Sequence, residues 1–399
     1  MKDQVALVGR TLGHSYSPEI HRLLAGKDYD YGLREVEPEG LEPLLRDPAY
    51  LGFNVTIPYK IDAMKVLDEI SPKAERIGCV NTIVRRPDGS LFGDNTDYDG
   101  FRYLIERTGI DPAGKKCLIL GSGGSSRTVR TVLTDLGAKE TVIISRSGEN
   151  NYQNLDRHRD AGIIVNTTPV GMYPNVGNAP LSLEPFPEVI GVLDLIYNPY
   201  RTDLVLDAEK RGIPAAGGLP MLVAQAEAGC RIFLGREPDG LPAEQVLDQL
   251  SRSMQNIVLI GMPGAGKSTV GRRIAEKEGR RLIDTDEEIV RREGVSIEQI
   301  FREHGEAYFR SIETEVLREA CAEKNVVIAA GGGVVTQPVN YNIIRRNSRV
   351  GWVQRDLSRL PISGRPISKS VPAETLFAQR KQAYESWSDF VIDNNERKG

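Results

Sequence analysis

The sequence predicts an α/β protein in which short apolar strands alternate with amphipathic helices. Two glycine-rich turns, one near residue 121 and one near residue 261, each follow a buried-strand run and open a helix. The first hundred residues also place polar side chains at the ends of apolar strands, where α/β sheets bind their ligands. The 399 residues are enough for two or three domains with separate cores.

The composition indicates a soluble protein that acts on small molecules. Hydrophobic residues make up 40% and charged residues 27%, and the net charge of −4 comes without a Lys/Arg block, which argues against a nucleic-acid partner. Cys79, Cys117, Cys230 and Cys321 are scattered, without C-x-x-C spacing, and predict reduced thiols. The chain lacks an apolar run of the roughly 18 residues that a membrane span needs, and its start lacks the apolar core of a signal peptide. We therefore expect a cytoplasmic protein without a membrane partner; the oligomeric state stays open.

The first polar motif follows the strand at Val5–Val8. Ser15 and Ser17 are two residues apart, and in an extended segment this spacing points both hydroxyls the same way. Two such donors suit the grip of a carboxylate. Alternatively, Ser17 only caps the helix that begins at Pro18.

The next strand begins at Leu51 and delivers Asn54 and Thr56 to its carboxyl end, with Lys60 just beyond Pro58. A lysine at this position would most often be a solvated charge at a helix start. The positive end of the helix dipole disfavours a cation there, and this mismatch favours a functional role.

Asn81 and Asp97 complete this set. Asp97 opens a helix expected to run to Thr108 and could be only its N-cap. The ordered motifs S-x-S, N-V-T-I-P-x-K, V-N-T and N-T-D resemble the shikimate dehydrogenase family over nearly the whole of the first 250 residues. The resemblance implies that Lys60 and Asp97 are the catalytic pair, and hydride transfer at an alcohol does need a group that takes or gives the hydroxyl proton. It also implies the residues that hold the cyclic acid: Ser15, Ser17, Thr56, Lys60, Asn81 and Asp97.

The middle of the chain is predicted to bind a dinucleotide. Lys116–Leu120 is a buried strand, and in the G-S-G-G-S-S turn after it Ser126 stands where the common fingerprint has its third glycine. The strand Thr141–Ile144 ends in Ser145 and Arg146, about 20 residues beyond the glycines. An arginine there favours a 2′-phosphate, so we expect a Rossmann-type domain that binds NADP(H).

The resemblance extends to this part with two departures. The family carries a second cation after Arg146, and because this chain has Asn150 instead, its preference for NADP should be weaker than usual. About 15 residues separate this strand end from the strand at Ile163, so the crossover helix should be very short or missing. The resemblance implies that Tyr197 and Gln225 face the substrate. It implies the following residues at the cofactor: Gly121, Ser122, Gly123, Gly124, Ser125, Ser145, Arg146, Leu195 and Gly218.

The last third begins with G-x-x-x-x-G-K-S at Gly261–Ser268, after the strand Asn256–Ile260. Its glycines allow successive backbone N–H groups to surround a phosphate, Lys267 reaches the outer phosphates, and Ser268 can ligate Mg²⁺. The helix from Lys267 should end at Gly279.

Two more features of this part indicate phosphoryl transfer. Asp284 and Asp286 end a strand with both carboxylates on one side, which suits a joint task around Mg²⁺ and a hydroxyl. Gly331–Gly333 follows the strand at Asn325–Ala329 and allows close approach of a ligand, or makes a plain turn.

Together with Tyr308-Phe-Arg310 on a helix, G-R-P at 364–366 and Q-R-x-x-x-Y at 379–384, these features resemble shikimate kinase. The resemblance implies that Lys267, Asp286 and Arg365 are catalytic, with Arg365 as the lid arginine that stabilises charge on the transferring phosphoryl group. The implied shikimate ligands are Asp286, Arg310, Gly332 and Arg380, and the implied Mg²⁺ ligands are Ser268 and Asp284. The implied ATP-binding residues are Gly264, Ala265, Gly266, Lys267, Ser268, Thr269, Arg365 and, at the adenine, Arg397. Residues 352–365 predict a compact lid, and a chain that stops at Gly399 without a closing helix predicts a loose adenine side.

The sequence therefore predicts three domains and two activities. An α/β substrate domain at 1–108, on which helices within 220–253 pack, is followed by the NADP domain at 109–253 and a parallel-sheet P-loop kinase domain at 256–399. We expect NADPH-dependent reduction of 3-dehydroshikimate to shikimate, and ATP-dependent phosphorylation of shikimate. Two alternatives are a quinate-type dehydrogenase fused to the kinase, and a ligand-sensing regulator derived from both enzymes.

Overall fold

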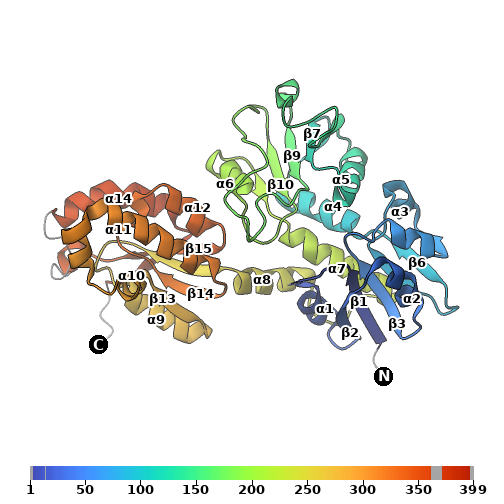
Figure 1. The fold of residues 1–399 in the computed structure, drawn as a ribbon, viewed down its shortest axis with the longest axis horizontal. Helices are drawn as coiled ribbons and strands as arrows, with labels where there is room; N and C mark the ends of the chain where they lie inside the picture. The colour runs from blue at the N-terminus through green and yellow to red at the C-terminus, as the bar shows by residue number, and fades with distance from the viewer. Residues whose placement is uncertain (1–2, 14, 361–370, 396–399) are drawn as a thin grey trace. The chain divides into compact units, whose positions relative to one another are not determined.

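The computed structural model describes residues 3–13, 15–360 and 371–395. The chain divides into two compact units, residues 1–249 and residues 250–399, coloured from blue to yellow-green and from yellow to red (Figure 1). Among the described residues, the strands of the first unit form two sheets and those of the second form one. In the same part of the chain, no helix has the length and apolar character needed to cross a membrane.

The first sheet of unit 1 is mixed, with strand order β2-β1-β3-β5-β6-β4. Strands β1, β2 and β3 are parallel, whereas β5 runs antiparallel to both β3 and β6. The P-D-G-S sequence explains the β5–β6 hairpin, because the Asp88 carboxylate accepts from the Ser90 N–H at 2.9 Å and Gly89 adopts a φ of +88°. The strands are β1 (Asp3–Gly9), β2 (Tyr29–Glu35), β3 (Tyr50–Val55), β4 (Glu69–Ile70), β5 (Thr82–Arg85) and β6 (Leu91–Asp94). The helices of this part are α1 (Ser17–Ala25), α2 (Leu41–Arg46), α3 (Pro72–Ile77) and α4 (Asp97–Thr108).

The second sheet of unit 1 is parallel throughout, with strand order β11-β10-β9-β7-β8. Between β8 and β9 the chain forms only the single 3₁₀ turn η3 (Leu155–His158), which confirms the prediction of a very short or missing crossover helix. The strands are β7 (Lys116–Leu120), β8 (Glu140–Ile144), β9 (Ile163–Asn166), β10 (Gly191–Asp194) and β11 (Ala215–Ala216). The helices are α5 (Gly124–Asp135), α6 (Asp203–Lys210) and α7 (Leu219–Leu234), and α8 (Ala243–Met254) contains the boundary between the two units.

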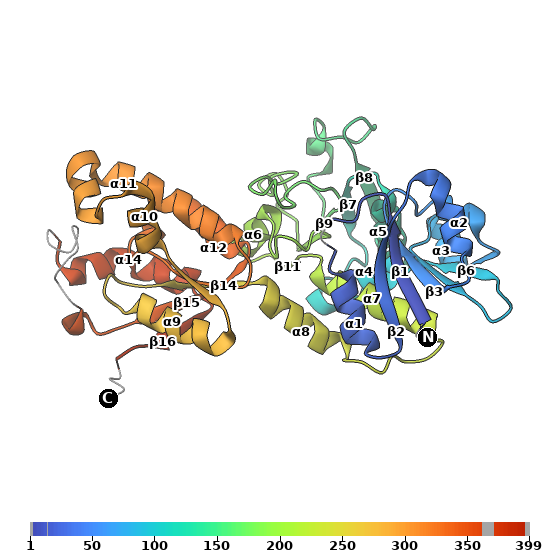
Figure 2. The ribbon, with the colours of Figure 1, turned by 60° about the horizontal axis from the view of Figure 1, so that its bottom comes forward.

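Helices α4 and α7 pack along each other in unit 1 (Figure 2). Gly100 permits this contact, because a Cβ atom there would lie 2.6 Å from the backbone oxygen of Met221. At the far end of α4, Arg107 donates to Glu244 of α8 at 2.7 Å. The pairing places the first residue of α4, Asp97, and the first turns of α7 beside the same cavity.

Unit 2 contains one parallel sheet with strand order β13-β14-β12-β15-β16. The inner strand β14 is buried along its whole length, as expected for a parallel strand covered on both faces. Gly279 adopts a φ of +64° and ends α9, which confirms the helix predicted from Lys267. The strands are β12 (Asn256–Ile260), β13 (Arg281–Asp284), β14 (Val326–Ala329), β15 (Ser348–Gln354) and β16 (Phe390–Asp393). The helices are α9 (Lys267–Glu278), α10 (Thr285–Glu293), α11 (Ile297–Ala322), α12 (Val339–Arg345) and α14 (Ala373–Trp387).

Candidate active sites

A cavity of about 230 Å³ lies in unit 1 where the first sheet meets the dinucleotide half. It collects residues that the sequence spreads over more than half of the chain. Its walls include every residue predicted to face the dehydrogenase substrate: Ser15, Ser17, Thr56, Lys60, Asn81, Asp97, Tyr197 and Gln225. Three of the residues predicted at the cofactor also line it: Ser125, Leu195 and Gly218.

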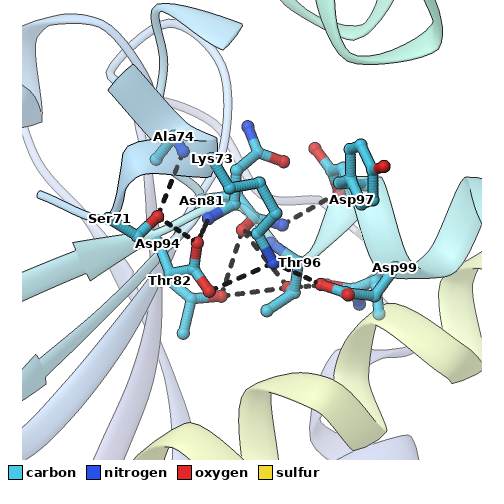
Figure 3. A network of polar contacts seen from close by, with 12 residues as sticks. Ser71, Lys73, Ala74, Asn81, Thr82, Asp94, Thr96, Asp97 and Asp99 are labelled. Atoms are coloured by element: carbon cyan, nitrogen blue, oxygen red, sulfur yellow. Dashed lines mark hydrogen bonds and ion pairs between the residues drawn. The ribbon is translucent and has the colours of Figure 1, made fainter. Parts of the chain in front are cut away.

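Lys60 and Asp97 form an ion pair in this cavity. The Nζ atom of Lys60 lies 2.5 Å from Oδ2 of Asp97, and the side chains are only 16% and 13% exposed. Asn81 donates from Nδ2 to the other carboxylate oxygen, Oδ1, at 2.9 Å (Figure 3). Asp97 is the first residue of α4 and Thr96 is its N-cap, so the carboxylate holds the lysine and the asparagine instead of capping the helix.

The start of α4 is fixed by a second polar cluster, also drawn in Figure 3. Lys73 of α3 contacts Asp94 at the end of β6 at 3.1 Å and Asp99 in the first turn of α4 at 2.7 Å. Asp94 also accepts from the Ser71 hydroxyl at 2.5 Å. These contacts join the strand end and the helix start on either side of Asp97.

The expected extended geometry at Ser15 and Ser17 was wrong. Tyr16 between them has φ −81° and ψ −7°, which is helical backbone, because the chain already turns into α1 at this residue. Ser17 makes no side-chain cap; its backbone N–H donates to Ser15 Oγ at 3.2 Å. The alternating-side argument therefore does not apply, although both serines do line the same cavity.

The glycine turn after β7 leaves space for an anion. Gly123 is the N-cap of α5, and a Cβ atom at Gly123 or Gly124 would meet no atom within 4 Å. Gly121 adopts a φ of +104° and packs against Thr167 and Thr168, just beyond β9. Ser126 replaces the third glycine without blocking the turn, because its buried hydroxyl donates back to the Gly123 carbonyl at 2.6 Å. Ser122 is exposed at the tip of this turn. A helix N-terminus with free backbone N–H groups fits a pyrophosphate.

The end of β8 presents a single cation. Arg146 is exposed, and Ser145 before it donates its backbone N–H to the carbonyl of Asn150 at 3.1 Å. The Asn150 side chain lies 3.1 Å from Nε2 of His158, a buried residue on η3. Burial lowers the pKa of His158 below its ordinary value. Asn150 is therefore held by the short crossover that replaces a helix here.

Gly218 faces Leu195 at the cavity edge. A Cβ atom at Gly218 would collide with the carbonyl of Leu195, which explains why only glycine fits at the N-cap of α7. Gln225 lies further along α7, where its Nε2 donates to the Leu222 carbonyl at 2.9 Å and its Oε1 meets the Thr96 hydroxyl at 3.4 Å. Two hydrogen bonds thus hold the Gln225 side chain at the cavity wall.

In unit 2 a cavity of about 350 Å³ surrounds the phosphate loop. Gly264 and Gly266 adopt φ values of +86° and +93°, which glycine reaches without strain. Lys267 is buried to 8% exposure, and its ammonium donates to the carbonyls of Gly261 and Met262 at 3.0 and 3.1 Å. The loop thereby holds the ammonium group in place at the cavity wall. Of the remaining loop residues, Ala265 is fully buried and Thr269 lines the cavity.

Ser268 and Asp284 converge on one point of this cavity. The Ser268 hydroxyl donates to Asp284 Oδ2 at 2.5 Å, and Asp284 Oδ1 accepts the backbone N–H of Asp286 at 3.0 Å. A hydroxyl and a carboxylate are the hard oxygen donors that Mg²⁺ prefers, usually one or two of them beside substrate phosphates. Among the described residues, no three His, Cys, Asp or Glu side chains are grouped for a larger metal site.

Arg310 lines the same cavity and has a buried partner that the sequence did not reveal. Its guanidinium donates to Glu313 at 2.6 Å and to Glu306 at 3.1 Å, and Glu313 is 1% exposed. Burial raises the pKa of Glu313 above its ordinary value. The Arg-x-x-Glu spacing on α11 was the available signal, because residues three apart share a helix face. A Cβ atom at Gly333 would overlap the guanidinium of Arg310.

Arg380 and Gly332 meet beside Asp286 in the same cavity. Arg380 donates to the Gly332 carbonyl at 3.0 Å, and the buried Tyr384 hydroxyl donates to the same oxygen at 2.8 Å. A Cβ atom at Gly332 would lie 2.5 Å from the ring of Pro263, so the glycine allows the triple-glycine turn to pack on the phosphate loop.

A second cavity of about 880 Å³ also borders the phosphate loop, at Gly266 and Thr269. It is bordered by Arg355, Arg359 and Asn394, which the sequence reasoning did not select. Asn394 donates to the Ala265 carbonyl at 2.7 Å, so the end of β16 is tied to the phosphate loop. The predicted lid residue Arg365 and the predicted adenine contact Arg397 lie outside the described residues.

Comparison with protein families gives two matches within the chain. A shikimate dehydrogenase substrate binding domain matches residues 7–83, and shikimate kinase matches residues 263–399. The shikimate dehydrogenase (NADP(+)) of Methanopyrus kandleri is 39% identical over 277 residues, which cover 62% of this chain and 95% of that protein. The protein of the same name from Clostridium perfringens is 35% identical over 263 residues, 61% of this chain and 97% of that protein.

Solved structures match the dehydrogenase part as well. A chorismate mutase/shikimate 5-dehydrogenase fusion protein from Clostridium acetobutylicum superposes with a TM-score of 0.60 at 36% identity and covers 63% of this chain and 97% of that chain. Shikimate 5-dehydrogenase from Thermus thermophilus, solved in complex with NADP(H) and shikimate, superposes with a TM-score of 0.56 at 32% identity, covering 62% and 99%.

Proposed function

The chain belongs to the shikimate dehydrogenase family and also contains a shikimate kinase segment. We propose that this one polypeptide catalyses two consecutive reactions. The first reduces 3-dehydroshikimate with NADPH to shikimate, and the second phosphorylates shikimate with ATP to shikimate 3-phosphate. The observation that carries this proposal is that each unit gathers the residues predicted to bind its substrate around its own cavity.

In unit 1, Lys60 and Asp97 act as the proton-transfer pair. Bound NADPH supplies the hydride that reduces the ketone carbon. Lys60 gives the substrate oxygen a proton as the hydroxyl forms, and Asp97, only 2.5 Å from its ammonium, holds it in position. Asn81 donates to the other oxygen of Asp97, which keeps the carboxylate oriented. The hydroxyls of Ser15 and Ser17 hold the substrate carboxylate as hydrogen-bond donors.

The cofactor is assigned to the second sheet of unit 1. The open turn at Gly123 and Gly124 receives the pyrophosphate at the start of α5. Arg146 meets the 2′-phosphate, and Gly218 lets the nicotinamide approach the substrate cavity. Arg146 lacks the second cation that the family usually has. The preference for NADP over NAD is therefore smaller than at a site with two cations.

In unit 2, the groups around the phosphate loop position shikimate against ATP. Arg310 and Arg380 hold the substrate carboxylate, while Asp286 accepts the proton of the attacking hydroxyl. Lys267 meets the outer phosphates of ATP, and Ser268 with Asp284 holds Mg²⁺. From the resemblance to shikimate kinase alone, we also propose that Arg365, outside the described residues, stabilises charge on the transferring phosphoryl group.

We also propose domain boundaries and a cellular compartment from the two family matches. The substrate domain comprises residues 1–108, the NADP domain residues 109–253 and the kinase domain residues 256–399, and the protein works in the cytoplasm, where its substrates and nucleotides are found.

The test is a pair of assays on the purified chain with shikimate as the common substrate. We expect NADP⁺ reduction in one assay and shikimate-dependent ADP release in the other. Quinate serves as the comparison substrate in the first assay, and turnover of quinate faster than of shikimate would redefine the dehydrogenase. A protein that binds shikimate but shows neither activity would contradict the proposal and indicate a ligand sensor.

A further inference from the structure

A run of hydrogen bonds leads from the interior of the first sheet to the proposed catalytic pair. Tyr31 donates its hydroxyl to Asn54 Oδ1 at 2.8 Å, and Asn54 donates from Nδ2 to Thr82 Oγ1 at 3.0 Å. Thr82 lies 3.1 Å from Asn81 Oδ1, and Asn81 donates from Nδ2 to Asp97 (Figure 3). Thr82 thus stands between two asparagine amides, both of which line the substrate cavity.

The donors and acceptors of this run have a fixed direction. The backbone N–H of Thr96 can only donate, and it meets Asn81 Oδ1 at 2.7 Å, so that atom must be the amide oxygen and Nδ2 must face Asp97. The Asn54 amide is fixed in the same way, because its Nδ2 lies 3.4 Å from the backbone carbonyl oxygen of Asn81, which can only accept. Its nitrogen therefore faces Thr82 and its oxygen faces Tyr31. The Thr82 hydroxyl accepts from Asn54, and its own proton points to Asn81 Oδ1, directly or through the Thr96 hydroxyl 3.1 Å away.

Burial makes the Thr82 hydroxyl hard to replace. Thr82 and Thr96 are 0% exposed, and Asn81 and Asn54 are 3% and 5% exposed. Water therefore cannot readily substitute for a missing partner, and a buried amide without one is expensive. Below Asn54, the ring of Tyr31 stacks on His21 with centroids 3.9 Å apart, which keeps the Tyr31 hydroxyl in place.

We propose that Thr82 is a positioning residue for the dehydrogenase reaction: its hydroxyl orders the Asn54 and Asn81 amides, and through Asn81 it orients the carboxylate of Asp97. Thr82 touches neither the substrate cavity nor the Lys60–Asp97 pair, so it acts only through its neighbours. This inference rests on the proposed function, because it assumes that Asp97 takes part in proton transfer.

The test compares a substitution that removes the hydroxyl with one that keeps it. Thr82→Val keeps the shape and removes the oxygen, whereas Thr82→Ser keeps the oxygen. We expect Thr82→Val to lower kcat/KM for shikimate by about tenfold, the effect of losing a buried hydrogen bond, and Thr82→Ser to stay within about twofold. KM for NADP⁺ and the kinase activity of the same chain should not change. Should Thr82→Val fail to fold, Thr82→Ala and Thr82→Ser form a second pair that differs by the oxygen atom.

Routing through Asn81 is tested by a double-mutant cycle. In an Asn81→Ala background, Thr82→Val should lower kcat/KM by no more than about twofold, because the amide that it orients is gone. Wild-type kinetics for Thr82→Val, equal losses for the valine and serine variants, or full additivity with Asn81→Ala would each overturn the inference. Failure of the proposed function is a separate result, since the wild-type chain itself would then reduce no NADP⁺.

Discussion

Gly333 and Arg310 fit together so closely in unit 2 that a Cβ atom on the glycine would occupy the space of the guanidinium. The glycine has a φ of −102°, so an alanine would meet no backbone strain there. The conflict is therefore confined to the end of one flexible side chain, and that side chain is a proposed ligand of the shikimate carboxylate.

Gly333→Ala should impair the kinase without unfolding it. Because Arg310 must leave its position between Gly333 and Glu313, we expect KM for shikimate in the kinase assay to rise by about tenfold or more, the scale of a charged hydrogen bond. Steady-state ADP release measures this, with the exposed Val339→Ala on α12 as the control. An unchanged KM would remove Arg310 from substrate binding.

Asp97→Asn should slow NADP⁺ reduction by about 10²–10⁴-fold, the usual contribution of a general acid–base partner. The asparagine keeps the size of the side chain but gives Lys60 no charged partner. Asp99→Asn is the matched control, because Asp99 lies on the same helix and pairs with Lys73 outside the cavity. Equal effects of the two substitutions would indicate that the rate depends on the structure of the helix start and not on the carboxylate of Asp97.

Arg146→Ala should weaken NADP⁺ binding and leave NAD⁺ nearly unaffected. A charged hydrogen bond to the 2′-phosphate contributes roughly 1.5–3 kcal/mol, which corresponds to an increase in Kd of about 10- to 150-fold. Titration of both cofactors into the wild-type protein, this variant and Arg130→Ala on α5 gives the comparison. Equal losses for NADP⁺ and NAD⁺ would show that Arg146 does not meet the 2′-phosphate.

Removal of Mg²⁺ should stop only one of the two reactions. Excess chelator should abolish shikimate phosphorylation, because the ion that we propose at Ser268 and Asp284 would neutralise phosphate charge during transfer. NADP⁺ reduction in the same solution should stay within about twofold, and added Mg²⁺ should restore the kinase. Phosphorylation that persists in chelator would contradict the metal assignment.

The sequence predicted the parts of both sites that local spacing encodes. The phosphate loop, the helix from Lys267 to its glycine stop at Gly279 and the missing crossover helix after β8 all follow from short-range signals. The extended geometry assumed at Ser15 and Ser17 failed because Tyr16, the N-cap of α1, already has helical backbone angles.

Other features depend on which buried polar groups meet. His158 against Asn150 and Thr82 between two amides became visible only in the folded chain, whereas the helical Arg-x-x-Glu spacing was an available signal for Glu313 beside Arg310. A pattern of residue types along the chain cannot state which buried polar groups meet, because packing decides this. The eight predicted substrate residues of unit 1 line one cavity. They could be predicted because they came from a resemblance to a family whose members share this packing.

We propose that the two sites work independently on one chain. The most direct measurement is both activities in the wild type, in Lys60→Ala and in Lys267→Ala, with thermal unfolding as the check on folding. Lys267→Ala should abolish ADP release, because the loop loses the ammonium held at Gly261 and Met262, and NADP⁺ reduction should stay within about twofold. Lys60→Ala should do the reverse. Loss of both activities in either variant, with the protein still folded, would contradict the two-site account.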